Sequence, residues 1–454
     1  MNETIAAIAT PNAVGGLSVI RISGPEAIAV SDQIFRPVSG IPLCEHKGYT
    51  AAYGTAIDAA GEIDNTIAVV YRAPRSYTGE NVVELSCHGG IIVTRRLLRA
   101  ALDAGARLAE AGEFTKRAFL NGKMSLTQAE SVLDIVNSQS EQAARCAMTA
   151  LDGALYQKIA RIKDRLVAQT SHITAWIDFP EEDVDAVKLS LLRNELLEIR
   201  QEIKDLIKTF DIGRVVHMGV NTAIVGKPNV GKSTLMNLLA GCEKSIVTDM
   251  AGTTRDIVEE TVNLGDVVLR LADTAGIHQT HDTVELAGID RAKKRIAEAD
   301  LVLLVLDASE ELDRQDVELM RVVRTKPTVV VLNKSDLGVQ IDEEYIKRDF
   351  QHSVLISAKD EAAVAELNAA VSRLMHLTEF DTNQPILANE RQRSCANMAL
   401  NHIEASLDAL SFGMTLDAVN ISIEDAIDAL LQLTGESVSD VVVDEVFSKF
   451  CVGK

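Results

Sequence analysis

The spacing of hydrophobic residues changes along the chain and predicts different kinds of structure in different segments. Up to about residue 120, β-rich runs are separated by Gly, Pro, Asn and Asp, and they predict strands over 17–22, 66–72 and 81–86. Apolar residues three and four positions apart predict a helix over 91–104. Residues 1–120 are therefore expected to form an α+β domain.

The next segment, residues 121–215, has the pattern of long helices. Its apolar residues recur every three or four positions, and one stripe consists of Leu192, Leu196, Ile199, Ile203, Leu206 and Phe210. A second stripe consists of Ala129, Val132, Val136 and Ala143. Such stripes are typical of packing between helices, and they predict a helical domain.

Residues 216–379 alternate short apolar runs with helical stretches. The runs lie at 221–225, 267–271, 301–306, 328–332 and 354–356. Several of them are apolar throughout, as expected for parallel strands that are covered on both faces. This pattern predicts a doubly wound α/β unit.

Helical spacing returns in residues 380–454, with one stripe at Ile423, Ile427, Leu430 and Leu433. The ends of a domain commonly lie close together, which makes insertion of one domain into another plausible. We therefore interpret residues 121–215 and 380–454 as two parts of one discontinuous helical domain. The α/β unit would be inserted between them.

Composition narrows the class of protein. The 454 residues carry 45 Lys and Arg against 66 Asp and Glu, a net charge of −21, which excludes a broadly basic surface that coats nucleic acid. No apolar run reaches about 18 residues, so no transmembrane helix is expected, and no secretory signal is apparent. Six scattered cysteines without CxxC spacing argue against a disulfide framework and fit a reducing cytoplasm.

One motif in the α/β unit indicates a nucleotide site. The sequence GKPNVGKS at 226–233 fits the phosphate-binding loop pattern, follows an apolar strand and opens a helix. Its glycines let backbone amides face phosphate, Lys232 would neutralise the β- and γ-phosphates, and the Ser233 hydroxyl would bind Mg²⁺. The residues expected to contact the nucleotide here are Asn229, Val230, Gly231, Lys232, Ser233 and Thr234.

Two later elements would recognise the base. The run Asn333, Lys334, Ser335, Asp336 ends an apolar strand, and the Asp336 carboxylate can accept from the N1–H and N2–H₂ donors of guanine. Adenine lacks this pair of donors, which favours GTP over ATP. The run Ser357, Ala358, Lys359 follows the next strand and offers a backbone amide to guanine O6.

Two elements that lie between the phosphate loop and the base-recognition runs would bind Mg²⁺ and contact the γ-phosphate. In the run Asp273, Thr274, Ala275, Gly276, the carboxylate would hold the hydration shell of Mg²⁺ and the glycine amide would contact the γ-phosphate. Thr254, within GTTRD at 252–256, is the candidate second Mg²⁺ ligand on a mobile switch. Five elements in this order predict a Ras-like P-loop GTPase domain.

The catalytic group is harder to assign. Many small GTPases place a glutamine where this chain has Ile277, which cannot orient water. Glu285 is the nearest carboxylate with helical context and Asp282 is its competitor, while a solvated switch helix is the alternative interpretation of both. No arginine is an obvious catalytic finger. Asn229 could instead coordinate a monovalent cation, or could serve only in hydrogen bonds within the loop.

Motifs outside the GTPase elements resemble one family along the whole chain. The sequence ends in FSKF at 447–450 and CVGK at 451–454. Further matching motifs are Ala-Thr-Pro at 9–11, GG at 15–16, RISG at 21–24, SYTGE at 76–80, HGG at 88–90, GEFT at 112–115, RAFLNGK at 117–123, DFP at 178–180 and GTTRD at 252–256. Together they resemble the tRNA modification GTPases known as MnmE or TrmE.

The resemblance implies a function and partners. It implies a homodimer formed through the amino-terminal domains, with 5,10-methylene- or 5-formyl-tetrahydrofolate bound near that interface by Arg21, Glu84, Lys123 and Lys454. It also implies an FAD-dependent partner of the MnmG or GidA type, in a heterotetramer. Together they would add a carboxymethylaminomethyl or aminomethyl group to C5 of the wobble uridine of tRNA.

The resemblance also implies roles within the GTPase cycle. Hydrolysis would be stimulated by K⁺, held by Asn229 and by backbone oxygens of the loop around Thr248 and Thr253. Glu285 matches the glutamate that orients water in the family.

The resemblance also implies a role for Cys451, which matches the family's tail. It would be a nucleophile toward the uridine ring or would help in one-carbon transfer. The alternative interpretation is a cysteine without a function.

A second interpretation remains open at this level. A regulatory GTPase in ribosome assembly, of the Era or Der kind, would share all five GTPase elements. The amino-terminal motifs and the CVGK tail favour tRNA modification, and we find no RNA-binding module that such a switch would need. Basic candidates for RNA phosphates are Arg95, Arg96, Arg99, Lys116 and Arg117, with a solvated helix face as the alternative.

Overall fold

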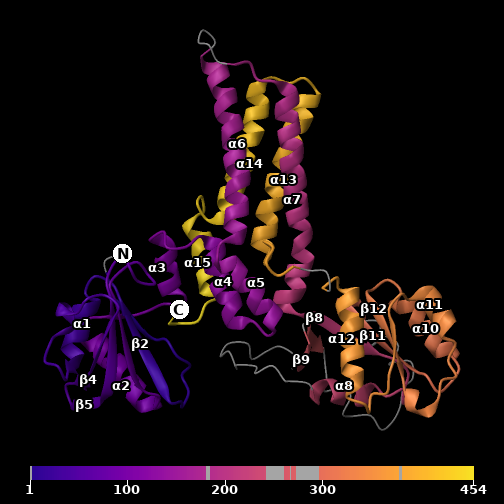
Figure 1. Ribbon diagram of the computed structural model, residues 1–454, viewed down its shortest axis with the longest axis horizontal. Coiled ribbons are helices and arrows are strands. Elements are labelled where there is room, and N and C mark those ends of the chain that lie inside the picture. The colour runs from indigo at the N-terminus through magenta and orange to yellow at the C-terminus, as the bar shows by residue number, and fades with distance from the viewer. Residues whose placement is uncertain are drawn as a thin grey trace. The chain divides into compact units, whose positions relative to one another are not determined.

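The computed structural model describes residues 3–179, 185–241, 260–265, 267–271, 296–377 and 381–453 (Figure 1). These residues form two compact units. Unit 1 comprises Met1–Leu133, Ile159–Val167 and Ile427–Lys454, and unit 2 comprises Asp134–Lys158 and Ala168–Ala426. Within the described part of the chain, no helix is long and apolar enough to cross a membrane.

Unit 1 is built on a seven-stranded sheet with the strand order β3-β4-β5-β6-β2-β1-β7. All neighbouring strands are antiparallel except β1 and β7. The strands are β1 (Ile5–Ile8), β2 (Leu17–Ser23), β3 (Phe35–Pro37), β4 (Thr50–Asp58), β5 (Gly61–Tyr71), β6 (Val82–His88) and β7 (Arg107–Leu108). The three predicted strands are thus confirmed as β2, β5 and β6, although Arg72 follows β5 and Asn81 precedes β6.

Helices α1 (Ala27–Ile34) and α2 (Ile91–Asp103) pack against the sheet. Buried residues of α2, such as Leu97 and Ala101, share one core with Ile20 and Ile22 of β2. The helix predicted over 91–104 is therefore confirmed. The short 3-10 helix η1 (Leu43–Glu45) packs against α1.

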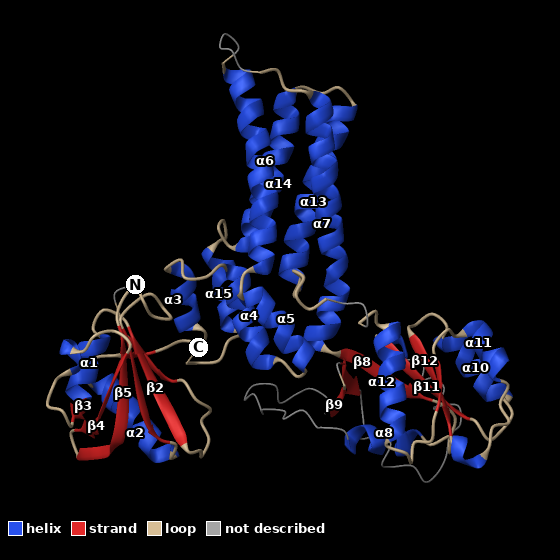
Figure 2. Cartoon of the chain, in the orientation of Figure 1, coloured by secondary structure: helices blue, strands red, loops and turns tan. Residues whose placement is uncertain are grey.

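A second core in unit 1 joins distant parts of the sequence. Helix α15 (Asp440–Ser448) packs near α3 (Glu113–Leu120) and α4 (Leu126–Asn137) (Figure 2). Its core residues include Leu126, Ala129, Val443, Phe447 and Phe450. The end of the sequence is thereby fastened to the amino-terminal part of the chain.

Long helices form the first part of unit 2. They are α5 (Glu141–Leu151), α6 (Ala154–Asp178), α7 (Leu189–Met218), α13 (Glu390–Ser411) and α14 (Leu416–Thr434), of which α6 and α14 also contribute to unit 1. The six residues of the predicted α7 stripe are all buried. Helices α7 and α13 lie side by side, with Lys204 Nζ 2.7 Å from Glu404 Oε1 (Figure 1). Helices from before and after the α/β unit thus pack together, as a discontinuous helical domain requires.

The rest of unit 2 is a six-stranded sheet with the order β13-β12-β11-β8-β10-β9, parallel apart from β9. The strands are β8 (Val220–Val225), β9 (Glu260–Leu264), β10 (Val267–Leu271), β11 (Leu301–Asp307), β12 (Thr328–Asn333) and β13 (Ser353–Leu355). The described helices are α8 (Lys232–Gly241), α10 (Arg314–Val323), α11 (Glu343–Asp349) and α12 (Ala362–Leu374), with a 3-10 turn η3 (Ser335–Leu337).

Both faces of this sheet are covered. Leu235 of α8 and Leu367 of α12 belong to the core on one face, whereas Met320 of α10 and Ile346 of α11 belong to the core on the other. Every residue of β11 and β12 is buried. The predicted doubly wound α/β unit is therefore confirmed.

His217 is a buried histidine at the end of α7, just before the sheet begins. Its side chain is 7% exposed, and Nδ1 lies 4.0 Å from Asp134 Oδ2. Its Nε2 atom is buried and meets no hydrogen-bond partner among the described residues. Burial lowers the pKa of His217 to about 4, so the ring is neutral at pH 7.

Acid should therefore weaken unit 2 through His217. Between pH 6.5, the pKa of an unfolded histidine, and pH 4, the unfolded chain binds the proton more tightly, so stability falls as pH falls. The free energy of unfolding is expected to fall by about 2 kcal/mol between pH 7 and 4.5. Urea unfolding at both pH values measures this change. The free energy of unfolding should fall less in His217→Gln than in His352→Gln, and equal decreases in both variants would contradict the prediction.

Candidate functional site

The predicted phosphate loop connects β8 to α8 and has the backbone that its motif requires. Gly231 has φ +98°, and a Cβ there would lie 2.2 Å from Asn333 Nδ2. Asn229 also has a positive φ of 65°, a conformation that asparagine tolerates better than most residues. Glycine is therefore needed at 231 for both the backbone angle and the space.

Lys232 lies across this loop. Its Nζ donates to the carbonyl oxygens of Gly226, at 2.9 Å, and Lys227, at 2.6 Å, and burial lowers its pKa. Ser233 and Thr234, in the first turn of α8, are exposed. The arrangement places an ammonium group and a helix amino terminus together, which suits a phosphate anion. The Ser233 hydroxyl is accessible to a hydrated Mg²⁺ ion.

Asn333 joins three loops at the carboxyl ends of the strands. Its Nδ2 donates to Val230 O of the phosphate loop at 2.8 Å, and its Oδ1 accepts from Ala358 N at 2.9 Å. The side chain is almost fully buried. The two predicted base-recognition elements and the phosphate loop therefore meet at one side chain.

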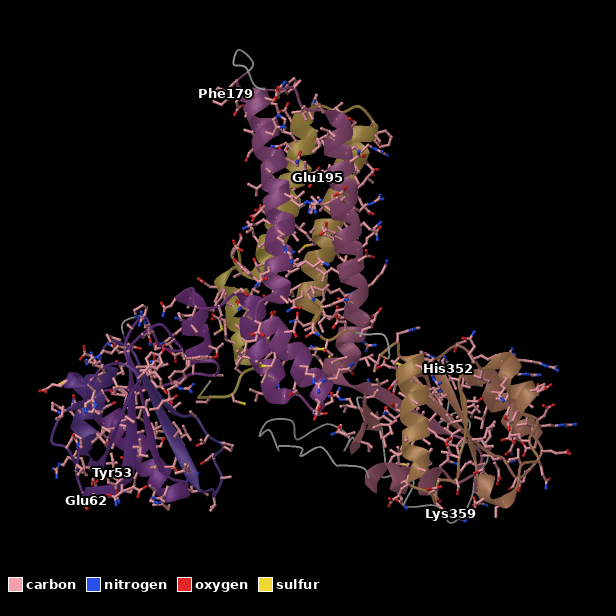
Figure 3. The ribbon with its side chains drawn as sticks, in the orientation of Figure 1. Tyr53, Glu62, Phe179, Glu195, His352 and Lys359 are labelled. Carbon is pink, nitrogen blue, oxygen red and sulfur yellow. The ribbon has the colours of Figure 1, made fainter. Side chains whose placement is uncertain are left out.

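Asp336 is held ready as an acceptor. Its carboxylate accepts from Ser357 Oγ at 2.9 Å and from Lys359 Nζ at 3.1 Å, and Lys359 is labelled in Figure 3. These two hydrogen bonds hold the pKa of Asp336 below its usual range. The carboxylate is therefore ionised at neutral pH and can accept from the two donors of a guanine edge.

Two sets of ion pairs in this site were not predicted. Lys334 has φ +66°, and its Nζ lies 2.6 Å from Asp307 Oδ2 at the end of β11. Lys227 Nζ is surrounded by carboxylates, at 3.0 Å from Asp316, 3.1 Å from Asp313 and 3.4 Å from Glu310. The only sequence signal for Asp307 was its place directly after an apolar strand.

Several predicted site residues lie outside the described residues. They are Thr248, Thr253, Thr254, Asp273, Thr274, Ala275, Gly276, Asp282, Glu285 and Lys454, together with Ile277. Of the predicted Mg²⁺ and K⁺ ligands, the described residues include Ser233 and Asn229, and both are exposed. The assignments of the others stay predictions.

The predicted folate residues form a second group, in unit 1. Arg21 of β2 and Glu84 of β6 are paired across the sheet, with Arg21 Nε 2.8 Å from Glu84 Oε1. The Arg21 guanidinium also lies over the rings of Tyr77, at 5.5 Å, and Phe114, at 5.6 Å. The sequence predicted both charges in one site, but it did not show that they pair with each other.

Lys123 reaches the loop that carries Tyr77. Its Nζ donates to Pro74 O at 3.1 Å, and Asn121 Nδ2 donates to Thr78 O at 2.7 Å. The Tyr77 hydroxyl lies 2.9 Å from Thr115 Oγ1 of α3. Lys123 is therefore linked to Arg21 through this loop.

The end of the sequence is attached to the same unit. Val452 forms an antiparallel bridge with Ala111, and Gly112 N donates to Cys451 O at 3.3 Å. Gly453 has φ +102°, and a Cβ there would lie 2.2 Å from Ile8 O at the end of β1. Since β1 pairs with β2 with Ala7 opposite Arg21, the tail contacts the strand next to the predicted folate site. The Cys451 residue is exposed.

Most of the basic candidates for RNA phosphates are engaged in ion pairs. Arg117 is almost fully buried between Glu113 and Glu80, so its interpretation as an RNA contact is wrong. The pairs formed by the others are Arg96 with Asp58, Arg99 with Asp103, and Lys116 with Asp444. These residues pair within the protein, which weakens the case for an RNA surface at this place.

Comparison with known proteins covers both units. Residues 4–123 match the family model described as "GTP-binding protein TrmE N-terminus", and residues 126–451 match the model of the MnmE helical domain. The second model spans the inserted α/β unit as well as the helices on both sides of it.

Curated relatives match from end to end. A tRNA modification GTPase MnmE of Lactobacillus johnsonii is 42% identical over 456 residues, which cover 100% of this chain and 98% of that protein. Proteins with the same name from Acetivibrio thermocellus and Clostridioides difficile are 39% and 38% identical, each over 100% of this chain. The matched regions cover 99% of the first of those proteins and 100% of the second. The chain therefore belongs to the MnmE family of tRNA modification GTPases.

Proposed function

We propose that this protein hydrolyses GTP as a subunit of the system that modifies C5 of the wobble uridine in tRNA. The observation that carries the proposal is the junction at Asn333, which joins the phosphate loop to both base-recognition elements. It occurs in a chain that full-length relatives named tRNA modification GTPases match. A nucleotide site with an acceptor for guanine is what such an activity needs.

The GTP site would use the described residues in separate roles. Asp336 would accept from the guanine edge, Lys232 would neutralise phosphate charge, and Ser233 would bind Mg²⁺. When bound, Mg²⁺ would stabilise the charge of the phosphates. Asn229 would hold K⁺ together with the loop of Thr248 and Thr253. The exposed positions of Ser233 and Asn229 are compatible with both roles.

A tetrahydrofolate site would lie on the sheet of unit 1. The pterin edge resembles that of guanine and suits Glu84 as an acceptor, while the folate carboxylates suit Arg21, Lys123 and Lys454. Arg21 and Glu84 form an ion pair on this sheet, with Arg21 Nη2 2.8 Å from Glu84 Oε1. Folate would supply a one-carbon unit when bound, and Cys451, on the attached tail, would take part in its transfer.

The remaining parts of the proposal concern the assembly. The protein would form a homodimer through its amino-terminal domains and would join an FAD-dependent protein of the MnmG or GidA type, in a heterotetramer that acts on tRNA. We place it in the cytoplasm, where its thiols stay reduced. Among the described residues, Cys44, Cys87, Cys146 and Cys451 carry free thiols, as expected in a reducing compartment.

Nucleoside mass spectrometry of tRNA tests the proposed function. Cells that lack this protein should lose the C5-aminomethyl-type uridines, and the wild-type chain should restore them. If these nucleosides are unchanged without the protein, tRNA modification is not its function. A ribosome-assembly GTPase would then be favoured, with altered ribosomal subunit profiles in the same cells.

Replacing Glu285 with alanine should leave GTP binding intact and slow hydrolysis by roughly a hundredfold to ten-thousandfold, because Ile277 has no group that orients water. Phosphate release at saturating GTP measures the effect, and Asp282→Ala is the matched variant. A slow Asp282→Ala enzyme beside a normal Glu285→Ala enzyme would assign the role to Asp282.

Replacing potassium with sodium should slow GTP hydrolysis if Asn229 holds K⁺. Equal hydrolysis rates in the two salts would contradict this role of Asn229.

A further inference from the structure

The segment that follows β11 carries carboxylates that the proposed mechanism does not use. Asp307 ends the strand, Glu310 and Asp313 follow in the loop, and Asp316 lies in the first turn of α10. Two lysines of the nucleotide site face these groups. One belongs to the base-recognition loop and the other to the phosphate loop.

The first contact fixes Lys334. Its Nζ lies 2.6 Å from Asp307 Oδ2, while Asp307 Oδ1 accepts from both the backbone nitrogen and the hydroxyl of Ser309. The Asp307 side chain is 5% exposed. Burial alone would raise the pKa of Asp307, but the hydrogen bonds from Lys334 and Ser309 outweigh it and hold that pKa below its usual range. Asp307 is therefore a fixed negative charge beside a loop whose Lys334 has a left-handed backbone.

The second contact fixes Lys227 of the phosphate loop. Its Nζ lies 3.0 Å from Asp316 Oδ2 and 3.1 Å from Asp313 Oδ2, and its side chain is 12% exposed. Burial by itself lowers the pKa of Lys227, but hydrogen bonds with Asp316 and Asp313 outweigh it and hold that pKa above its usual range. Lys227 therefore stays charged and tied to α10.

The carboxylates are themselves ordered by the backbone. Asp313 and Asp316 form a capping box at the start of α10, in which each side chain accepts from the backbone nitrogen of the other. Ala308 N donates to Asn333 O at 2.7 Å, and Gln340 N donates to Ala308 O at 2.8 Å. Backbone hydrogen bonds thus order Asp313 and Asp316, while Asp307 is held by Ser309 as well as by Lys334.

We propose that residues 307–316 act as a carboxylate brace that positions both nucleotide-binding loops, with Asp307 acting through Lys334 and Asp316 through Lys227. The brace rests on the proposed GTP site and deepens it. Neither carboxylate needs to touch the nucleotide. Their effect comes from holding the two lysine-bearing loops at the spacing that base and phosphates require.

The test compares isosteric variants of the full chain. Asp307→Asn and Asp316→Asn should each weaken binding of GDP and of GTP by about tenfold, equally for the two nucleotides because neither pair senses the γ-phosphate. Asp342→Asn is the matched control, because Asp342 caps α11 by accepting from Tyr345 N. It should bind both nucleotides like the wild type. Wild-type affinity in both test variants would overturn the brace.

A double-mutant cycle separates positioning from a loss of structure. If Asp307 acts through Lys334, then adding Asp307→Asn to Lys334→Met should weaken binding no further, and the same holds for Asp316→Asn added to Lys227→Met. Additive losses, or losses that follow the melting temperature, would contradict the proposal. If the wild-type chain itself fails to bind GDP and GTP, the proposed function fails instead.

Discussion

Replacing Asn333 with alanine is expected to weaken binding of GDP and GTP by roughly a thousandfold. The substitution leaves Val230 O and Ala358 N without the partners they have now, at 2.8 and 2.9 Å. A buried polar backbone group without a partner costs about 1–3 kcal/mol, so two such groups together correspond to this loss of affinity. Equilibrium binding of a fluorescent GDP analogue measures it directly.

The control for Asn333 is another amide in the same unit. Asn368 in α12 accepts from Ser372 Oγ at 3.2 Å, and its described hydrogen bonds join no nucleotide loop. Asn368→Ala should therefore bind GDP like the wild type. Asn333→Asp gives a second check, because it keeps an acceptor for Ala358 N but turns a carboxylate oxygen toward Val230 O. If either Asn333 variant binds GDP normally, the three loops do not depend on this side chain.

Hydrophobic spacing predicted the long helix α7 but was wrong for the second stripe, because Ala143 lies in α5 and not in α4, and Val136 is exposed. The α7 stripe is buried at all six positions, because a helix of this length must hide one face along its whole extent. The buried strands β11 and β12 were also predictable as continuous apolar runs.

Strands of the amino-terminal sheet were harder to predict. Strand β4 contains several alanines and one glycine, residues that seldom indicate a strand. Gly54 is nevertheless required there, because a Cβ would lie 2.2 Å from Arg36 O in the neighbouring strand. Strand β9, Glu260–Leu264, begins with two polar residues and lies at the edge of its sheet. Neither strand has the apolar run that identified the others.

In the candidate site, the motifs could be predicted from the sequence, but the contacts between their side chains could not. The motifs placed Asn333, Lys334 and Asp336 correctly as one element, because the order of strands and loops determines which ends meet. The partners of charged residues could not be predicted. Glu113 and Arg117 have the spacing of an ion pair on one helix, but the spacing does not show that Arg117 is buried or that it also binds Glu80.

Substituting Gly453 with alanine is expected to abolish the proposed wobble-uridine modification and to leave GTP hydrolysis unchanged. The Cβ would lie 2.2 Å from Ile8 O, and φ at this position is +102°, so the tail cannot keep its present contact. Cys451 would then leave its place beside Ala111 and Gly112. In cells that depend on the variant, nucleoside mass spectrometry should show loss of the C5-aminomethyl-type uridines, and Cys451→Ser, which removes the thiol itself, should show the same loss.

Gly61 is a control that separates the effect of the Cβ clash from the effect of a positive φ. Gly61 also has a positive φ, +121°, in the same unit, but a Cβ there would meet nothing within 4 Å. Gly61→Ala therefore carries the strain without the clash and should keep its modified uridines. If Gly453→Ala keeps them as well, attachment of the tail is not needed for the chemistry. If Gly453→Ala loses them while Cys451→Ser keeps them, the tail acts through its position and not through the thiol.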